Sequence, residues 1–238
     1  MSHDLTRRDF LATTAAIVGS TQRPQAPASK GTIVLFQGDS ITDNGRNRTA
    51  TEANAAGALG NGYPLLAAAA VLAARPGHDL RFYNRGISGN KVPDLQQRWS
   101  ADALELQPDV LSILIGVNDF WHKLSGRYSG TVRDYEEQYA ALLELTRRAL
   151  PRVHLIVLEP FVLRVGAVDQ HWFPEFDQRR AAAARVAKQA RTTFVPLQSV
   201  FDQRVRRAPP AFWAADGVHP TPAGHVVIAE QWRRAAHL

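Results

Sequence analysis

Cysteine is absent from this chain of 238 residues. Its absence excludes disulfide bonds, thiolate catalysis and cysteine-ligated metals, and it also excludes a lipid anchor attached through cysteine. Long hydrophobic runs are missing as well, because the mildly apolar stretch 12–19 is too short to span a bilayer. We therefore expect no stable insertion into a membrane.

The basic surplus of the chain lacks the pattern of a nucleic-acid-binding protein. The formal net charge is +6, and almost all of it comes from arginine. Much of this arginine occurs as pairs near the ends of expected helices, where cations complement the helix dipole. These pairs are residues 147–148, 179–180, 206–207 and 233–234. No basic face is interleaved with aromatic residues, so we expect no nucleic-acid partner.

Length and composition favour a single globular domain. Hydrophobic residues make up 45% of the chain and charged residues 21%, which is usual for a soluble protein with one substantial core. We assign residues 29–238 to this domain. An exposed apolar patch cannot be located from one sequence, so the sequence leaves the formation of a homo-oligomer open.

The first 28 residues are typical of a targeting segment. The stretch from Thr6 to Leu11, with Arg7 and Arg8 inside it, resembles a twin-arginine export signal. Small residues at 26–28 suit a cleavage site, although the sequence does not decide whether and where cleavage occurs. The alternative is a short amphipathic helix capped by Thr6. The export interpretation places the protein in the periplasm or outside the cell.

From residue 32 onward, short apolar runs alternate with longer helical patterns. Strands are expected at 32–37, 80–84, 110–116, 153–159 and 193–196. Helices are expected at 63–74, 92–106, 132–150, 174–189, 198–206 and 222–236. This alternation predicts an α/β fold, a three-layer α/β/α sandwich around a five-stranded parallel sheet of flavodoxin-like order.

Ser40 follows the first predicted strand and is the strongest candidate for a nucleophile. Glycine at position 38 allows a sharp turn, and the hydroxyl then lies at the carboxyl edge of the sheet, where open α/β folds bind ligands. Near the other end of the chain, Asp216 precedes His219 by three residues and could orient its ring. Together they form a catalytic set in the order Ser, Asp, His.

Two further loops follow predicted strands and would open onto the same edge. One is the glycine-rich segment 84–90, and the other is the Gly-Val-Asn-Asp segment 116–119. With the Gly-Asp-Ser-Ile block at 38–41 and the Asp-Gly-Val-His-Pro block at 216–220, these segments resemble the blocks of the SGNH hydrolases, also called GDSL esterases. The resemblance extends from about residue 31 to residue 235.

This resemblance implies specific roles for the block residues. Ser40 would be the nucleophile, His219 the general base and Asp216 the residue that orients the ring. The oxyanion hole would consist of the N–H of Ser40, the N–H of Gly89 and the side-chain amide of Asn118. Such donors stabilise the negative charge that develops on an ester carbonyl oxygen during attack. No cofactor or metal is implied.

Within this family the chain is most similar to acetylxylan and xylo-oligosaccharide acetyl esterases, through the segments 38–43, 57–63, 84–90 and 115–119. The partner would be a small acetylated carbohydrate. Aromatic side chains that could flank a sugar are Trp213, Tyr63, Trp121 and Trp172, although ordinary packing would also account for them. The segments 43–61 and 118–131 are polar and are expected to be loops, which favours a short acyl group.

Other functions stay open at this point. A lipid esterase for short chains, or a lysophospholipase-type hydrolase, would use the same residues. Glycoside hydrolysis would use two of the carboxylates of Asp39, Asp119 and Asp216, and a metal-dependent hydrolase would use Asp39, Asp216 and His219 as ligands. A carbohydrate-binding pseudoenzyme is the non-enzymatic alternative. We expect instead that Asp39, Asp43 and Asp119 tie down loops through backbone hydrogen bonds.

Overall fold

A five-stranded sheet with the strand order β2-β1-β3-β4-β5 forms the centre of the protein. All four neighbouring pairs are parallel. The computed structural model describes residues 31–238, so the expected export signal at 1–28 lies outside the described residues. The strands are β1 (Ile33–Gly38), β2 (Arg81–Asn84), β3 (Val110–Leu114), β4 (His154–Leu158) and β5 (Thr193–Val195).

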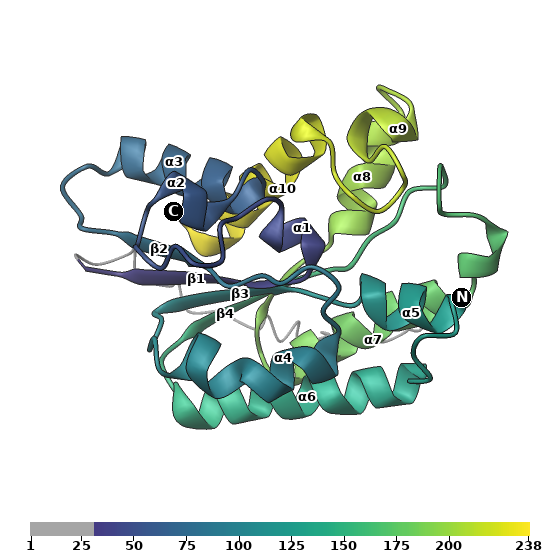
Figure 1. Ribbon diagram of the computed structural model, residues 1–238, viewed down its shortest axis with the longest axis horizontal. Helices are drawn as coiled ribbons and strands as arrows, with labels where there is room; N and C mark the ends of the chain where they lie inside the picture. The colour runs from purple at the N-terminus through teal and green to yellow at the C-terminus, as the bar shows by residue number, and fades with distance from the viewer. Residues whose placement is uncertain (1–30) are drawn as a thin grey trace, which may run out of the picture.

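Helices cover both faces of this sheet, as Figure 1 shows. One face carries α3 (Tyr63–Ala74), α8 (Leu197–Val205) and α10 (Pro222–Ala236). The other face carries α4 (Val92–Trp99), α6 (Val132–Ala149) and α7 (Glu175–Gln189). The predicted three-layer α/β/α sandwich with a flavodoxin-like sheet is therefore confirmed.

Burial on both faces explains the continuous apolar runs of the strands. In β1, Val34 and Phe36 pack into the core below α3 and α10, whereas Leu35 points into the core on the opposite face. Every residue of β3 and β4 is buried. Such strands have no polar face, so they lack the alternation that a half-exposed strand would show.

Several short helices were not predicted. They are α1 (Ser40–Asp43), α2 (Ala56–Leu59), α5 (Val117–Leu124), η2 (Gln170–Trp172) and α9 (Pro210–Trp213). The expected helix at 92–106 is an α-helix only as far as Trp99. The chain then continues as a short π-helix, η1 (Ser100–Leu104). Because α5 occupies the start of the segment 118–131, the expectation of a loop there is wrong for its first part.

None of the helices in residues 31–238 combines the length and hydrophobicity needed to cross a membrane.

Candidate active site

Ser40 lies at the carboxyl edge of the sheet, directly after β1. It is the first residue of α1, and Asp39 caps this helix by accepting a hydrogen bond from the Ile41 N–H at 3.0 Å. The chain turns away from the sheet at this point, so the Ser40 side chain is partly exposed, while Ile41 and Thr42 are buried.

A chain of hydrogen bonds joins Ser40 to the segment before α10. Ser40 Oγ lies 2.9 Å from His219 Nε2, and His219 Nδ1 lies 2.7 Å from Asp216 Oδ2. Asp216 Oδ1 accepts the backbone N–H groups of Val218 at 2.9 Å and His219 at 2.7 Å. Residues 179 positions apart in the sequence therefore meet at one point.

The environment of Asp216 determines the tautomer of His219. Partial burial acts to raise the pKa of Asp216, but hydrogen bonds from His219 and Val218 outweigh it, and the pKa is lowered. An ionised carboxylate accepts a proton-bearing Nδ1, which leaves the lone pair of Nε2 facing the Ser40 hydroxyl. In this arrangement His219 can accept the hydroxyl proton.

Three hydrogen-bond donors border the same edge. Within residues 31–238, the backbone N–H groups of Ser40 and Gly89 have no protein acceptor. Asn118 lies in the first turn of α5, and its Nδ2 donates to Asn90 O at 3.2 Å, which leaves its second N–H for a ligand. The Ile87 N–H donates to Gly38 O at 3.0 Å, so the loop that carries Gly89 runs beside the end of β1.

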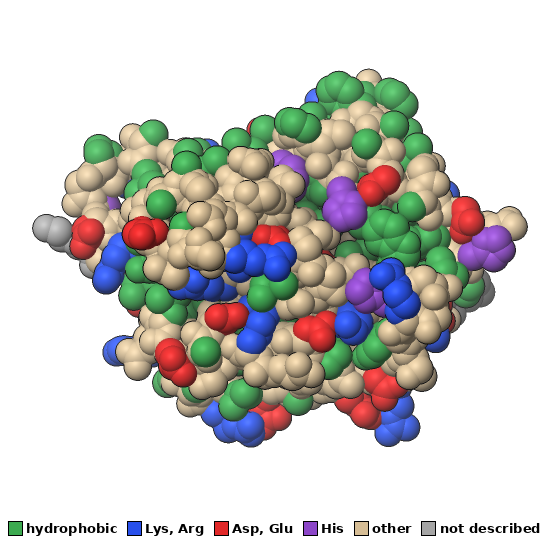
Figure 2. Space-filling view, in the orientation of Figure 1, with side chains coloured by type: hydrophobic (Ala, Val, Ile, Leu, Met, Phe, Trp, Pro, Cys, Tyr) green, Lys and Arg blue, Asp and Glu red, His purple; other side chains and the backbone are tan. Residues whose placement is uncertain are grey.

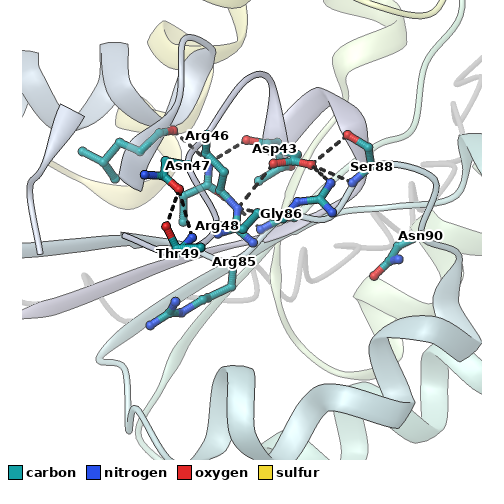
Figure 3. A network of polar contacts seen from close by, with 12 residues as sticks. Asp43, Arg46, Asn47, Arg48, Thr49, Arg85, Gly86, Ser88 and Asn90 are labelled. Carbon is teal, nitrogen blue, oxygen red and sulfur yellow. Dashed lines mark hydrogen bonds and ion pairs between the residues drawn. The ribbon is translucent and has the colours of Figure 1, made fainter. Parts of the chain in front are cut away.

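A polar network holds this loop in place (Figure 3). Asp43 Oδ2 accepts the backbone N–H and the hydroxyl of Ser88 at 2.9 and 2.8 Å and also bonds to Arg48. Arg46 Nε donates to Gly86 O at 2.8 Å. Burial acts to raise the pKa of Asp43, but the bonds from Arg48 and Ser88 lower it overall. The network therefore fixes the loop before any ligand binds.

Only one of the four predicted aromatic residues offers a ring at this edge, because Trp172 is fully buried against Phe120 and two others are also buried. Trp121 is half-buried, and its ring centre lies 5.9 Å from that of His219. Tyr63 is fully buried, with its hydroxyl 3.1 Å from Thr42 Oγ1, so its predicted contact with a sugar is wrong. Trp213 is only 9% exposed and bonds to Ala208 O, which makes it a core residue rather than an open platform.

His122 is a site residue that the sequence analysis missed. It lies one turn after Asn118 on α5, and its Cε1 is 3.9 Å from where a Cβ on Gly89 would lie. Burial lowers the pKa of His122, and the charges of Arg127 and Lys91 lower it further. A helix expected at 117–124 would have placed His122 and Asn118 on one face through their spacing of four. Figure 2 shows histidine and hydrophobic side chains side by side where α1, α5 and the segment before α10 meet.

Three acidic residues tie down loops as predicted. Asp39 accepts from Ile41, Asp43 from Ser88, and Asp119 from the Val92 N–H at 3.1 Å. Asp39 and Asp119 are 1% and 0% exposed, so neither could act on a glycosidic bond together with Asp216. Residues 31–238 hold no group of three or more histidine, cysteine, aspartate or glutamate side chains arranged to bind a metal ion.

An α/β sandwich that carries a serine–histidine–aspartate chain at the carboxyl edge of its sheet has the architecture of a serine hydrolase. The profile of the GDSL-like Lipase/Acylhydrolase family matches residues 36–227. The chain belongs to this family and is a carboxylic ester hydrolase.

Individual relatives agree with this assignment. An acetylxylan esterase of Geobacillus stearothermophilus is 35% identical over 206 residues, which are 86% of this chain and 93% of that protein. The solved structure of an acetylxylan esterase from the same organism has a TM-score of 0.78 at 32% identity and covers 90% of this chain and 97% of its own. A GDSL-like lipase of Parabacteroides merdae has a TM-score of 0.87 at 45% identity, over 90% of this chain and 99% of its own.

Proposed function

We propose that this protein is a serine esterase that removes acetyl groups from xylo-oligosaccharides. The observation that carries the proposal is the contact of 2.9 Å between Ser40 Oγ and His219 Nε2, continued at 2.7 Å to Asp216. A serine hydroxyl is a weak nucleophile unless a base accepts its proton, and His219 is placed to do so.

In the first half of the reaction, His219 Nε2 takes the proton of Ser40 as Oγ attacks the acetyl carbonyl carbon. The charge on the carbonyl oxygen is stabilised by the N–H groups of Ser40 and Gly89 and by the Asn118 amide. The Gly89 N–H does not have to move into place during the reaction, because Asp43 and Arg46 hold the loop around Gly89.

To complete this half, His219 passes the proton to the sugar oxygen, which leaves as a hydroxyl. In the second half, a water molecule attacks the carbonyl carbon of the acetyl-enzyme while His219 takes one of its protons. The bond between Ser40 Oγ and the acetyl group then breaks, His219 returns the proton to Ser40 Oγ, and acetate is released. Asp216 stabilises the imidazolium that exists in both steps.

The choice of substrate is supported by the surface around Ser40 and by the relatives. Trp121 offers an aromatic ring beside His219, and His122, which lies beside Gly89 and close enough to Lys91 and Arg127 to feel their charges, adds polar groups to the same edge. A polar rim gains little from each added methylene, whereas an apolar groove would gain about 0.8 kcal/mol per buried CH₂. The acetylxylan esterase activity of a relative with 35% identity points to the same substrate class.

The test compares wild type with Ser40→Ala. Wild type should release acetate from acetylated xylo-oligosaccharides and should be labelled by a fluorophosphonate, and Ser40→Ala should do neither. Full activity in Ser40→Ala would reject the nucleophile. A kcat/KM that rises steadily from acetate to octanoate esters would instead identify a lipid esterase with the same catalytic set.

We also propose export through the twin-arginine pathway, on the basis of Arg7 and Arg8. Replacing both with lysine should retain the protein in the cytoplasm. Normal amounts of the double variant outside the inner membrane would reject this proposal.

A further inference from the structure

Two carboxyl groups are buried directly beside the proposed oxyanion hole. Asp39 immediately precedes Ser40, and Asp119 immediately follows Asn118. Their exposed fractions are 1% and 0%. The reaction described above uses neither of them, and burying an ionised carboxylate without a partner costs several kcal/mol. Because burial of these carboxyl groups is unfavourable, we ask what they contribute to the adjoining site.

Asp119 connects the two parts of the chain that supply oxyanion donors. Its Oδ1 accepts the Val92 N–H at 3.1 Å, and the neighbouring Asn118 donates to Asn90 O at 3.2 Å. Two consecutive residues of α5 are therefore bonded to Asn90 and Val92, which lie one and three positions after Gly89. These two bonds set the distance between the Gly89 N–H and the Asn118 amide.

The second oxygen of Asp119 indicates which form of the carboxyl group is present. Asp119 Oδ2 is buried and has no hydrogen-bond partner among the described residues. An ionised carboxylate would leave a negative charge there without a hydrogen-bond donor, whereas a protonated one leaves only an unpaired neutral hydroxyl, which is less unfavourable.

The charged and titratable groups around Asp119 come from several elements. They are Asp39 before α1, Lys91 before α4, Tyr128 before α6, Tyr135 and Tyr139 on α6, and Arg179 on α7. Burial raises the pKa of Asp119 to about 7, although the Val92 N–H, Arg179 and Lys91 act to lower it. Burial likewise raises the pKa of Asp39 to about 7, and the charge of Asp119 adds to the rise.

We propose that Asp119 is a positioning residue of the oxyanion hole, which holds the Gly89 loop against α5 and does so as a neutral acid. This inference rests on the proposed esterase function. A negative charge next to Asn118 would oppose the negative charge that the hole must stabilise in the transition state. The oxyanion hole therefore places two requirements on Asp119: its carboxyl group must be uncharged, and it must accept the hydrogen bond from Val92. The two requirements can be tested separately.

Two substitutions separate these requirements. Asp119→Asn keeps an acceptor for Val92 but cannot ionise, and Asp119→Leu has a similar volume but no acceptor. The control is Asp109, which accepts the Ile33 N–H at 2.8 Å at the opposite end of the sheet. Asp109→Asn and Asp109→Leu should leave kcat unchanged.

At pH 7 we expect Asp119→Leu to lower kcat on the order of 10²-fold with little change in KM, as for the loss of an oxyanion donor. Asp119→Asn should retain kcat at pH 7 and keep it at pH 9, where the kcat of wild type declines. Unchanged kcat in Asp119→Leu, or a loss in Asp119→Asn as large as in Asp119→Leu, would overturn the positioning role. A decline at pH 9 that is equal in wild type and Asp119→Asn would overturn the neutral form.

Unfolding in urea provides a readout that does not depend on activity. A folded-state pKa raised above the unfolded value of 3.8 means that stability falls as pH rises towards 7. The unfolding constant of wild type relative to that of Asp119→Asn should therefore rise roughly tenfold or more between pH 5 and pH 8. A constant ratio would overturn the neutral form. Loss of activity in Ser40→Ala together with unchanged Asp119 variants would reject this inference alone, whereas an active Ser40→Ala would reject the proposed function.

Discussion

Replacing Asp216 with asparagine tests how the imidazole of His219 is oriented. Asp216 Oδ1 accepts two backbone N–H groups, from Val218 at 2.9 Å and from His219 at 2.7 Å. An amide nitrogen cannot accept hydrogen bonds, so the amide oxygen of the variant must take this position. The amide nitrogen then faces His219 Nδ1, where a carboxylate oxygen lies at 2.7 Å in wild type.

This exchange forces the wrong tautomer on His219. With a donor facing Nδ1, the ring carries its proton on Nε2 and donates it to Ser40 Oγ instead of accepting the hydroxyl proton. In a serine protease the same substitution lowers kcat about 10⁴-fold, which corresponds to about 5.5 kcal/mol. The opposite amide orientation would lose two backbone hydrogen bonds at about 1 kcal/mol each, so it too would lower the active fraction about 30-fold.

We therefore expect Asp216→Asn to lower kcat by about 10⁴-fold and by no less than about 30-fold. The assay is acetate release from acetylated xylo-oligosaccharides. Asp169→Asn is the matched control, because Asp169 accepts the His171 N–H at 2.8 Å and contacts His171 Nδ1 at 3.0 Å. His171 is exposed, and it is His219 that bonds to Ser40. A loss smaller than about tenfold in Asp216→Asn would refute this account of the tautomer.

Three further predictions concern the oxyanion hole, the turn after Asp216 and a buried histidine. Asn118→Ala should lower kcat about 10²–10³-fold with little change in KM, and a raised KM with intact kcat would make Asn118 a binding residue instead. Gly217→Ala should lower the free energy of unfolding by more than the same change at Gly126, which has nothing within 4 Å. Both glycines have positive φ, but a Cβ at Gly217 would lie 2.4 Å from two backbone carbonyl oxygens, and equal losses in urea unfolding would contradict this explanation. Burial lowers the pKa of His225 from 6.5 to about 4, so the folded state holds this histidine in its neutral form. The folded protein is therefore destabilised as pH falls from 6.5 towards 4, where the unfolded chain binds a proton that the folded chain does not. His225→Gln should lose less stability than wild type over this pH range, and an equal loss would refute the lowered pKa of His225.

Much of the fold followed from the sequence because its signals are local. Strands covered on both faces are continuously apolar, and each of the five expected strands overlaps an observed one. Parallel strands end at one edge of a sheet, so the blocks around Ser40, Gly89 and Asn118 had to lie close together once the strands were assigned. The short helices α1, α5 and α9 were missed because four to eight residues carry too little periodicity to be distinguished from loops.

The tertiary structure alone decided which side chains are available to a ligand. Tyr63 follows one expected polar loop and Trp121 lies within the other. Tyr63 nevertheless packs against Phe36 with ring centres 5.6 Å apart and is fully buried, whereas Trp121 remains half-buried beside His219. Likewise, Asp39, Asp119 and Asp216 are the same residue type near the same edge, but only Asp216 is left accessible. Burial depends on elements that are distant in sequence, such as α10 over β1, and therefore has no local pattern in the chain. The sequence by itself determined the strands and the motif blocks, whereas the packing of the helices determined how each group at the site can act.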